Sequence, residues 1–498
     1  MAELNETMRR FQELRGVGQQ MAGYDAATWR AAAGDRHMRS TVIAVMLLDS
    51  TPSWDVLRAR FERLTRMVPV LRERPLFGAV GISSPRLSLD PDFDLDIHLH
   101  RYRLHDGAGW NDVLDEARRI SLTDFDHGRP LWDMHLIEGL PGDRAAMILK
   151  LHHAIADGQG TVLMAANLVT IAPEGNPDEP EAPSIPSGSS VSVARVSSAN
   201  IHDNVGRSFH YAAEGVKIAA GLAVGTIKDP VGTWSEALGM VSSIGRFAAM
   251  PEAAMSPVMQ GRCTTYHFRT FDFPFAEMRS AAKRHGFSVN DVFMAAVATG
   301  ADYYHERHGQ TARQLRFNLP ISLRSVSKDG SSANAVTIAR FPLPVSGASI
   351  EERLKAAHDI VRKWRDEPAL SLSNPLADVS WLLPVPLIAW TASHSDITTS
   401  NVPGPPVPLY LAGSRIVGMW PLVATMGSSL NITMITYDKS AFVGVTADDE
   451  AVPDIEDFMV DLRKGFEELL ESAVGSQDPL AVGAPPAAAK KPAAAKKP

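Results

Sequence analysis

Cysteine is nearly absent from this sequence of 498 residues, in which Cys263 is the only one. One thiol cannot form an internal disulfide or supply a multi-cysteine metal cluster, and this fits a reducing, cytoplasmic compartment. We interpret Cys263 as a packed thiol, with a nucleophilic role as the less favoured alternative. Residues 1–15 mix charged and apolar groups without the apolar core of a secretory signal, so export by that route is not expected.

Long hydrophobic runs are also missing. The best candidate for membrane contact, Val379–Trp390, has about 12 residues where a membrane-spanning helix needs about 20, and it contains Pro384 and Pro386. We therefore expect a buried or groove-lining segment, and the alternative is a surface that dips into lipid. The protein is predicted to be cytoplasmic, with peripheral contact at the inner membrane face or a lipid-droplet surface as a further option.

An excess of positive charge is absent as well. The formal net charge is −8, and Lys490, Lys491, Lys496 and Lys497 lie in the last nine residues, so the rest of the chain carries −12. This balance argues against nucleic acid as a partner. Hydrophobic residues make up 45% and charged residues 21%, which is typical of a soluble globular protein. The tail rich in Ala, Pro and Lys is predicted to be disordered and to aid solubility, with attraction to anionic lipid as the weaker alternative.

Alternating strand and helix patterns indicate an α/β protein. Thr41–Leu48 is rich in strand-forming residues, and Trp54–Val68 follows with apolar residues at helical spacing. Leu131–Leu136 and Ala145–His153 are predicted to form a hairpin, because Pro and Gly residues lie between them. The later strands and helices are predicted at Thr264–Phe271, Phe275–His285, Asn290–His305, Arg316–Ile321, Ala335–Phe341, Asn431–Tyr437, Ala441–Thr446 and Ile455–Ser472.

Composition divides the chain into four parts. We assign residues 1–172 to a first α/β half, 173–262 to a Pro-rich linker with two bridging helices, 263–474 to a second half, and 475–498 to the tail. The chain is too long for one core, because a typical domain has about 150 residues. Two compact units with connectors are therefore expected.

The run His152-His153-Ala154-Ile155-Ala156-Asp157-Gly158 carries the candidate chemistry. Strand alternation points the two histidines to opposite faces, so a shared metal ion is not expected, because two-histidine metal sites favour the i, i+4 spacing of a helix. Imidazole has a pKa of about 6.5 and is mostly neutral at cytoplasmic pH, so one histidine can take a proton from a hydroxyl group. Asp157 and Gly158 are interpreted as a tight turn that organises this base and carries no proton.

This run resembles the HHxxxDG motif of the superfamily that contains chloramphenicol acetyltransferase and the condensation domains of nonribosomal peptide synthetases. More narrowly, the chain resembles the bacterial wax ester synthase/diacylglycerol acyltransferase family of the actinobacterial type. The matches run nearly end to end and include Pro130-Leu131-Trp132, Asn290-Asp291-Val292, Pro320-Ile-Ser-Leu-Arg324 and Ser400-Asn-Val-Pro-Gly-Pro405. The resemblance implies two chloramphenicol-acetyltransferase-like domains, each a two-layer α+β unit, around a central tunnel.

The resemblance also implies roles for single residues. His153 would be the general base and His152 would support it. Long-chain acyl-CoA would enter one mouth of the tunnel as co-substrate, and diacylglycerol or a fatty alcohol would enter the other. The acyl group would pass directly to the alcohol, without an acyl-enzyme, to give triacylglycerol or a wax ester. No bound cofactor or metal is expected, and no G-x-S-x-G nucleophile motif occurs at a strand and helix boundary.

Further residues are candidates for substrate or tunnel contact, and each has a plainer structural interpretation. They are Pro130, Leu131, Trp132, Asn290, Asp291, Ser322, Arg324 and Asn401. The first three would otherwise pack at the start of a strand, and the next two would cap a helix as an acidic capping box with Ser288. Arg324 would pair with Asp157, meet CoA phosphates or be exposed. Ser322 and Asn401 are candidate donors to the developing oxyanion.

Two other classes of function stay open beside acyl transfer to diacylglycerol. One is a noncatalytic lipid-binding or acyl-CoA-binding protein on the same fold, against which the intact histidine motif argues. The other is an esterase that uses water as the acceptor. Turnover of a labelled acyl-CoA with each alcohol would separate the three.

Overall fold

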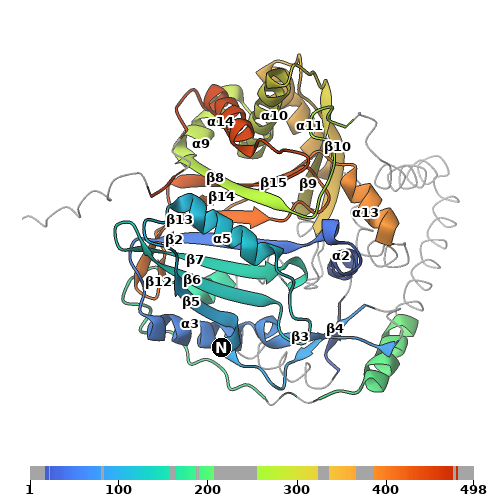
Figure 1. The fold of residues 1–498 in the computed structure, drawn as a ribbon, viewed down its shortest axis with the longest axis vertical. Coiled ribbons are helices and arrows are strands. Elements are labelled where there is room, and N and C mark those ends of the chain that lie inside the picture. Colours follow the sequence, from blue (N-terminus) through green and yellow to red (C-terminus); the bar gives the residue numbers. More distant parts are fainter. Residues whose placement is uncertain are drawn as a thin grey trace, which may run out of the picture.

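Two six-stranded sheets organise the chain into two α/β halves (Figure 1). The computed structural model describes residues 17–21, 23–79, 84–155, 164–186, 188, 190–206, 255–322, 336–365, 385–474 and 478–480. The predicted α/β class is confirmed. The expected bridging helices and most of the tail lie outside these residues, as do Asp157, Gly158 and Arg324.

The N-terminal sheet has the strand order β12-β13-β2-β7-β6-β5. Its central strand β7 is buried along almost its whole length, as its nearly continuous apolar sequence requires. Helix α5 packs between this sheet and the first strand of the other half. The elements of this half are α2 (Gly23–Gly34), η1 (Arg36–Met38), β2 (Thr41–Leu48), α3 (Trp54–Met67), β5 (Leu99–Arg103), α5 (Trp110–Leu122), β6 (Trp132–Leu140), β7 (Arg144–His152), η4 (His153–Ile155), β12 (Tyr410–Leu411) and β13 (Ser414–Val423).

The C-terminal sheet has the strand order β10-β9-β11-β14-β15-β8. Its helices other than α13 lie on the face turned away from the N-terminal half (Figure 1). Phe317, Ile432 and Met434 pack into the core under these helices, and the alternating positions between them face the other way. The elements are β8 (Tyr266–Pro274), α9 (Phe275–His285), α10 (Val289–Arg307), β9 (Gln314–Ser322), β10 (Val336–Pro344), α11 (Ile350–Arg365), α13 (Val385–Ser393), β11 (Ile397–Val402), β14 (Leu430–Tyr437), β15 (Ser440–Asp448) and α14 (Ile455–Leu470).

A small third sheet and short connecting elements lie beside the N-terminal half. The sheet has the order β1-β4-β3. These elements are β1 (Gln19–Gln20), η2 (Pro69–Arg72), β3 (Glu73–Leu76), β4 (Arg86–Leu89) and α4 (Leu95–His98).

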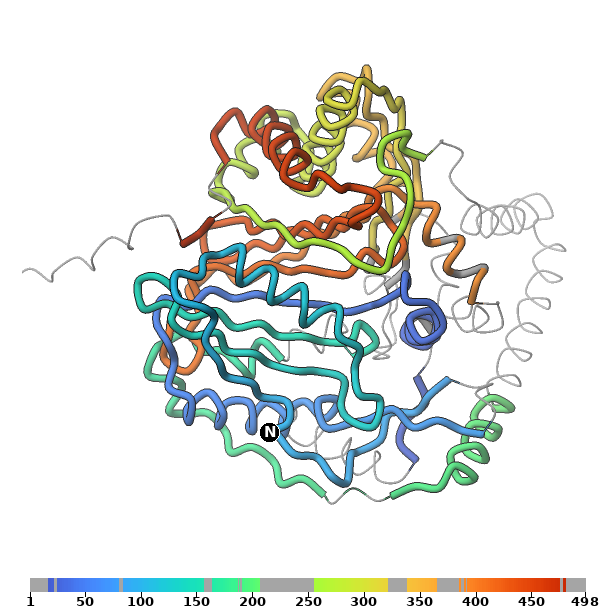
Figure 2. Tube along the Cα trace, in the orientation of Figure 1, coloured from blue at the N-terminus to red at the C-terminus, as the bar shows by residue number. Residues whose placement is uncertain are grey.

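Two strands late in the sequence, β12 and β13, belong to the N-terminal sheet. β13 pairs antiparallel with β2, with Val423 opposite Val42, so the chain returns to the N-terminal half after β11 and leaves it again before β14 (Figure 2). The halves touch closely at this strand, because a Cβ atom on Gly444 of β15 would lie 1.9 Å from the carbonyl oxygen of Pro421. The division into halves by sequence position does not hold for these two strands.

Many local predictions are confirmed. Thr41–Leu48 and Phe275–His285 form the predicted strand and helix with the predicted bounds, and β6 and β7 form the predicted hairpin. The capping box at α10 is present, since Ser288 Oγ accepts from the Asp291 N–H at 3.2 Å and Asp291 Oδ2 accepts from the Ser288 N–H at 2.9 Å. Residues 164–168 are also helical, and Ile171 after them is exposed.

Candidate active site

The two adjacent histidines lie at the point where β7 ends. The strand stops at His152, one residue earlier than predicted, and His153 begins the short turn η4. The His152 N–H donates to the Leu131 carbonyl oxygen at 3.0 Å, and the His153 N–H donates to the Ser40 carbonyl oxygen at 2.8 Å. Backbone bonds to two different neighbours therefore fix this turn in place.

His152 is enclosed by aromatic rings. Its ring centroid lies 4.9 Å from that of Trp29 and 5.7 Å from that of Phe125, and the residue is only 6% exposed. Burial, followed by the neighbouring His153 and His127, lowers the pKa of His152 to about 3. His152 is therefore neutral throughout the physiological pH range.

Hydrogen bonds fix which ring nitrogen of His152 carries the proton. The Ala154 N–H donates to His152 Nδ1 at 3.1 Å, so this nitrogen is unprotonated. In a neutral imidazole the proton then lies on Nε2, which is 3.2 Å from Ser40 Oγ. Both ring nitrogens are engaged, and His152 is not available to accept a proton from a substrate.

His153 is the more accessible of the pair, since it is partly exposed. Burial of its ring lowers the pKa of His153, so the imidazole is neutral near pH 7. A neutral imidazole at the end of a rigid strand suits a general base. The two histidines thus differ in burial and in position on the strand.

Ser40 contacts both histidines and was not identified from the sequence. Its carbonyl oxygen accepts from His153, its hydroxyl oxygen lies within hydrogen-bond distance of His152 Nε2, and it is 1% exposed. It stands between η1 and β2, two elements far from the histidines in sequence. A lone serine before a strand carries no signal that could have revealed this role.

A cavity of about 300 Å³ opens beside His152, and we call it the histidine cavity. Its wall includes Trp29, Arg36, Arg39, Ser40, His127 and His152. Arg39 Nη2 donates to Asp124 Oδ1 at 3.0 Å and its Nη1 donates to the Thr264 carbonyl oxygen at 3.2 Å. Arg39 therefore links this cavity to the start of the C-terminal half.

Polar side chains of the C-terminal sheet approach the histidine turn from the other half. The Ala424 N–H donates to the Thr41 carbonyl oxygen at 3.0 Å, and the Ala424 carbonyl oxygen accepts from Asn431 Nδ2 at 3.3 Å. Thr41 is the residue opposite His152 in the pairing of β2 with β7. Thr433 Oγ1 donates to Asn431 Oδ1 at 3.0 Å. Alternation in the predicted strand Asn431–Tyr437 was the only sequence signal for this polar face.

The predicted residues Pro130, Leu131 and Trp132 are buried in the N-terminal core. The Trp132 indole N–H donates to the Leu71 carbonyl oxygen at 2.8 Å, and the ring stacks on His98 with centroids 4.7 Å apart. Leu131 supplies the carbonyl oxygen that accepts from the His152 N–H. These residues support the histidine turn from behind, and Trp132 lines neither of the two cavities described here.

Asn290 and Asp291 lie at the start of α10 in the C-terminal half. Asp291 is 1% exposed, caps the helix with Ser288, and has its Oδ2 3.1 Å from His358 Nδ1. Asn290 Nδ2 lies 3.4 Å from Met294 Sδ, one turn along the same helix. Both residues act within this helix and its neighbours, as the capping interpretation predicts.

The remaining candidates divide between the sheet and the undescribed residues. Asn401 of β11 stands opposite Met434 of β14, so it shares the helix-covered face and points away from Asn431. The role of Asn401 as a donor to the oxyanion stays a prediction. Ser322 is the last residue of β9, opposite Val336, while Arg324, Asp157 and Gly158 lie outside the described residues.

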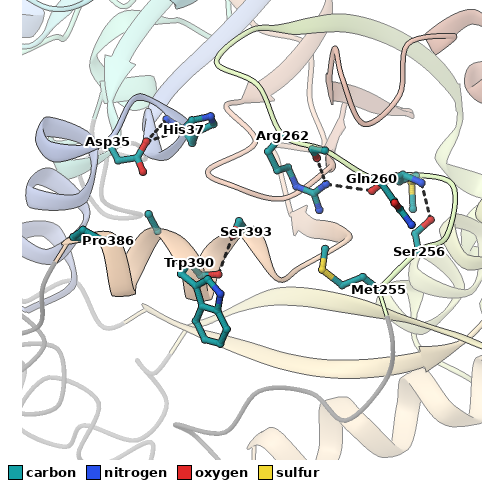
Figure 3. A pocket seen from close by; sticks show the side chains of 12 residues that line it. Asp35, His37, Met255, Ser256, Gln260, Arg262, Pro386, Trp390 and Ser393 are labelled. Atoms are coloured by element: carbon teal, nitrogen blue, oxygen red, sulfur yellow. Dashed lines mark hydrogen bonds and ion pairs between the residues drawn. The ribbon is translucent and has the colours of Figure 1, made fainter.

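A second and larger cavity of about 630 Å³ lies between η1, residues 255–262 and α13, and we call it the outer cavity. Figure 3 shows Asp35 and His37 on one side of it and Arg262 and Gln260 on the other, with Trp390 on α13. Segment Val379–Trp390 was expected to be buried or to line a groove, and its described part, in α13, contributes Pro386, Ala389 and Trp390 to this wall.

Comparison with known sequences decides the family. The profile of the wax ester synthase/diacylglycerol acyltransferase catalytic domain matches residues 21–293, and that of the C-terminal domain of the same family matches residues 332–470. The chain belongs to this family. It is an acyltransferase, as the histidine motif predicts.

Relatives and solved structures agree with this assignment. A putative diacylglycerol O-acyltransferase of Mycobacterium tuberculosis is 32% identical over 95% of both chains, and a probable one from the same species is 24% identical over 86% of this chain and 91% of its own. The wax ester synthase/diacylglycerol acyltransferase of Marinobacter aquaeolei superposes with a TM-score of 0.54 at 21% identity, covering 94% of this chain and 98% of its own.

A condensation domain of the calcium-dependent antibiotic synthetase shares the fold. It superposes with a TM-score of 0.58 at 16% identity, covering 91% of this chain and 95% of its own. The predicted two-domain α/β architecture is thereby confirmed. Within the described residues, no helix has the length and apolar character needed to cross a bilayer, and no three His, Cys, Asp or Glu side chains are grouped as metal ligands.

Proposed function

We propose that this acyltransferase forms triacylglycerol from diacylglycerol and long-chain acyl-CoA, with His153 as the general base. The observation that carries this proposal is the hydrogen bonding of the histidine pair. His152 has both ring nitrogens engaged, which leaves His153 as the base of the motif. The names of the mycobacterial relatives support diacylglycerol as the acceptor. Formation of wax esters from fatty alcohols is a second activity that the family name supports.

The proposed reaction needs one group that carries a proton, and it forms no covalent acyl-enzyme. His153 takes the proton of the acceptor hydroxyl as its oxygen attacks the thioester carbonyl carbon. The tetrahedral intermediate then collapses, the carbon–sulfur bond breaks, and the CoA thiolate leaves with the proton that His153 returns. The products are the new ester and free CoA. Asp157 and Gly158 keep their proposed role as the turn that organises the base.

Ser40 is a positioning residue in this scheme. It holds His152 by its hydroxyl group and His153 by its carbonyl oxygen, without a role in proton transfer. His152 in turn accepts the Ala154 N–H and so fixes the turn that carries His153. The base is thereby held in one orientation, which is the main contribution a rigid scaffold makes to catalysis.

The test is turnover of labelled palmitoyl-CoA offered together with diacylglycerol and hexadecanol, with the lipid products separated by chromatography. His153→Ala should lose about 10² to 10⁴ of the rate, which is the usual contribution of a general base. His152→Ala should keep a measurable part of the rate, because this residue positions and does not transfer the proton. Wild-type activity in His153→Ala would overturn the mechanism.

The same assay separates the other function classes. Release of free palmitate faster than ester formation would identify an esterase. Binding of palmitoyl-CoA without any product would identify a noncatalytic lipid-binding protein. Triacylglycerol as the dominant product supports the proposal, and a dominant wax ester would reassign the acceptor.

A further inference from the structure

The outer cavity lies between the two halves at the edge of the interface that carries the histidine turn. Its N-terminal wall is Asp35 and His37, and its C-terminal wall includes Arg262 and the side chains of α13. α13 rests directly on α2 and η1, since Ala389 packs with Ala31 and Met38. Elements of both halves therefore shape this cavity.

The charged groups of the outer cavity are already engaged. Asp35 Oδ1 accepts from the His37 N–H at 2.9 Å and lies 2.8 Å from His37 Nδ1. Arg262 Nε donates to the Gly427 carbonyl oxygen at 2.8 Å, and its Nη2 donates to the Ser395 carbonyl oxygen at 2.8 Å. The charges of the Asp35 carboxylate and the Arg262 guanidinium, on opposite sides of the cavity, offset each other. The cavity therefore has no excess of one charge that would favour a highly charged ligand.

Apolar side chains supply much of the remaining wall. Met255 and Met259 line it from one side, and Pro386, Ala389 and Trp390 line it from α13. Methionine adapts to irregular flexible chains, and Trp390 is 52% exposed at the rim. A volume of about 630 Å³ is within the range of about 300–1,000 Å³ found for small-molecule sites. The wall suits a hydrocarbon chain.

Two short segments contribute to the outer cavity and also to the surroundings of the histidine turn: residues 35–39 around η1, and the backbone from Ala424 to Gly427. Asp35 and His37 face the outer cavity, whereas Arg36 and Arg39 of the same stretch line the histidine cavity. Arg262 binds Gly427, three residues after Ala424, whose N–H donates to the Thr41 carbonyl oxygen. The walls of the two cavities are thus built from adjoining residues of the same short segments.

We propose that the outer cavity binds the long hydrocarbon chain of a lipid substrate and that Ala389 and Trp390 set the chain length accepted. The inference rests on the proposed acyl transfer for the identity of the chain, which comes from the acyl thioester or from the acceptor alcohol. Each buried methylene contributes about 0.8 kcal/mol, or about fourfold in binding. Blocking room for about three methylenes therefore changes the preference by on the order of 50-fold.

Direct binding is tested without turnover, on the full chain. Dibrominated stearyl alcohol quenches a tryptophan only over short distances, so wild-type fluorescence should fall on its addition. Trp390→Phe should lose a large part of this quenching, while Trp54→Phe, a matched change on α3, should not. Equal quenching in wild type and Trp390→Phe would place the chain elsewhere and overturn the proposal.

Turnover of two variants with opposite expected effects identifies the source of the chain. Ala389→Phe fills the cavity and should shift preference from C16 toward C8, and Trp390→Ala opens it and should shift preference toward longer chains. A shift seen when the acyl-CoA is varied assigns the thioester chain, and one seen when the alcohol is varied assigns the acceptor. Unchanged chain-length ratios in a folded Trp390→Ala would refute the specificity role. If the wild-type protein forms no ester while the quenching pattern is as expected, the proposed function is refuted and the assignment of the cavity stands.

Discussion

Removal of the Ser40 hydroxyl is the sharpest perturbation of the histidine turn. Ser40→Ala leaves the backbone bond from His153 in place and removes only the acceptor for His152 Nε2, which lies 3.2 Å away. A hydrogen bond between neutral groups contributes about 0.5–1.5 kcal/mol net. Since Ser40 lines the histidine cavity, water can enter and replace part of the bond. We expect the free energy of unfolding to fall by about 1 kcal/mol.

The catalytic effect follows from loss of orientation. If the same 1–1.5 kcal/mol is lost from the transition state, kcat falls about 5- to 10-fold. KM for acyl-CoA should stay within about twofold, because Ser40 acts through His152 and does not bind the substrate in this scheme. Steady-state kinetics and histidine ¹⁵N NMR, which reports the tautomer of His152, provide the readouts.

Controls decide whether the effect is specific. Thr41→Val is the matched control, because Thr41 is the next residue, lines the same cavity and stands opposite His152. This change leaves the Ser40 hydroxyl in place and should leave kcat nearly unchanged. Ser40→Thr keeps the hydroxyl and should restore most of the rate. In a double-mutant cycle, Ser40→Ala should cost little in the background of His152→Gln. Full additivity of the two changes would refute the positioning role.

Three further predictions concern pH and stability. Burial lowers the pKa of His153, so kcat/KM should stay high down to pH values below 6.5 and fall only when the imidazole becomes protonated. A pH–rate profile in which kcat/KM begins to fall above pH 7 would contradict this prediction. Burial also lowers the pKa of His152 to about 3 and that of His135 to about 4, so as the pH falls the unfolded chain takes up these protons before the folded protein does. The free energy of unfolding should therefore fall below pH 6.5, by about 1.4 kcal/mol per pH unit for each histidine. Urea unfolding at several pH values measures this dependence, and His135→Gln should make it weaker. Trp132→Ala should lower the free energy of unfolding by about 3–5 kcal/mol, because it removes a fully buried indole. Asp291→Ala should lower the free energy of unfolding by about 0.5–2 kcal/mol through loss of the helix cap, and it should leave kcat per folded molecule unchanged.

Local patterns in the sequence predict the elements of this fold well. Thr41–Leu48 and Phe275–His285 have the predicted bounds, because strand composition and a proline before a helix act over short distances. The placement of β13 in the N-terminal sheet was not predicted, because the pairing of Val423 with Val42 depends on contacts between distant parts of the chain. Sequence order alone cannot distinguish a strand that stays in its own half from one that crosses.

The candidate site was predicted in part. The motif identified the histidine pair, yet alternation alone did not show that β7 ends at His152 and that His153 lies in a turn. Asn401 was a candidate because of its motif, but its register opposite Met434 turns it toward the helix-covered core. Ser40 contacts the histidine pair only because β2 pairs with β7, and no local pattern encodes this pairing of separate strands.

The different tasks that we propose for the two histidines follow from one residue's difference in backbone position. Inside the strand, His152 has Thr41 opposite it, and its side chain turns back to accept the Ala154 N–H. That bond places the remaining proton on Nε2, toward Ser40, so neither nitrogen can act as a base. His153 begins the turn η4, one residue beyond the end of the strand. Lengthening β7 by one residue would therefore place the proposed base inside the sheet, so the position of the strand end matters as much to the proposal as the imidazole itself.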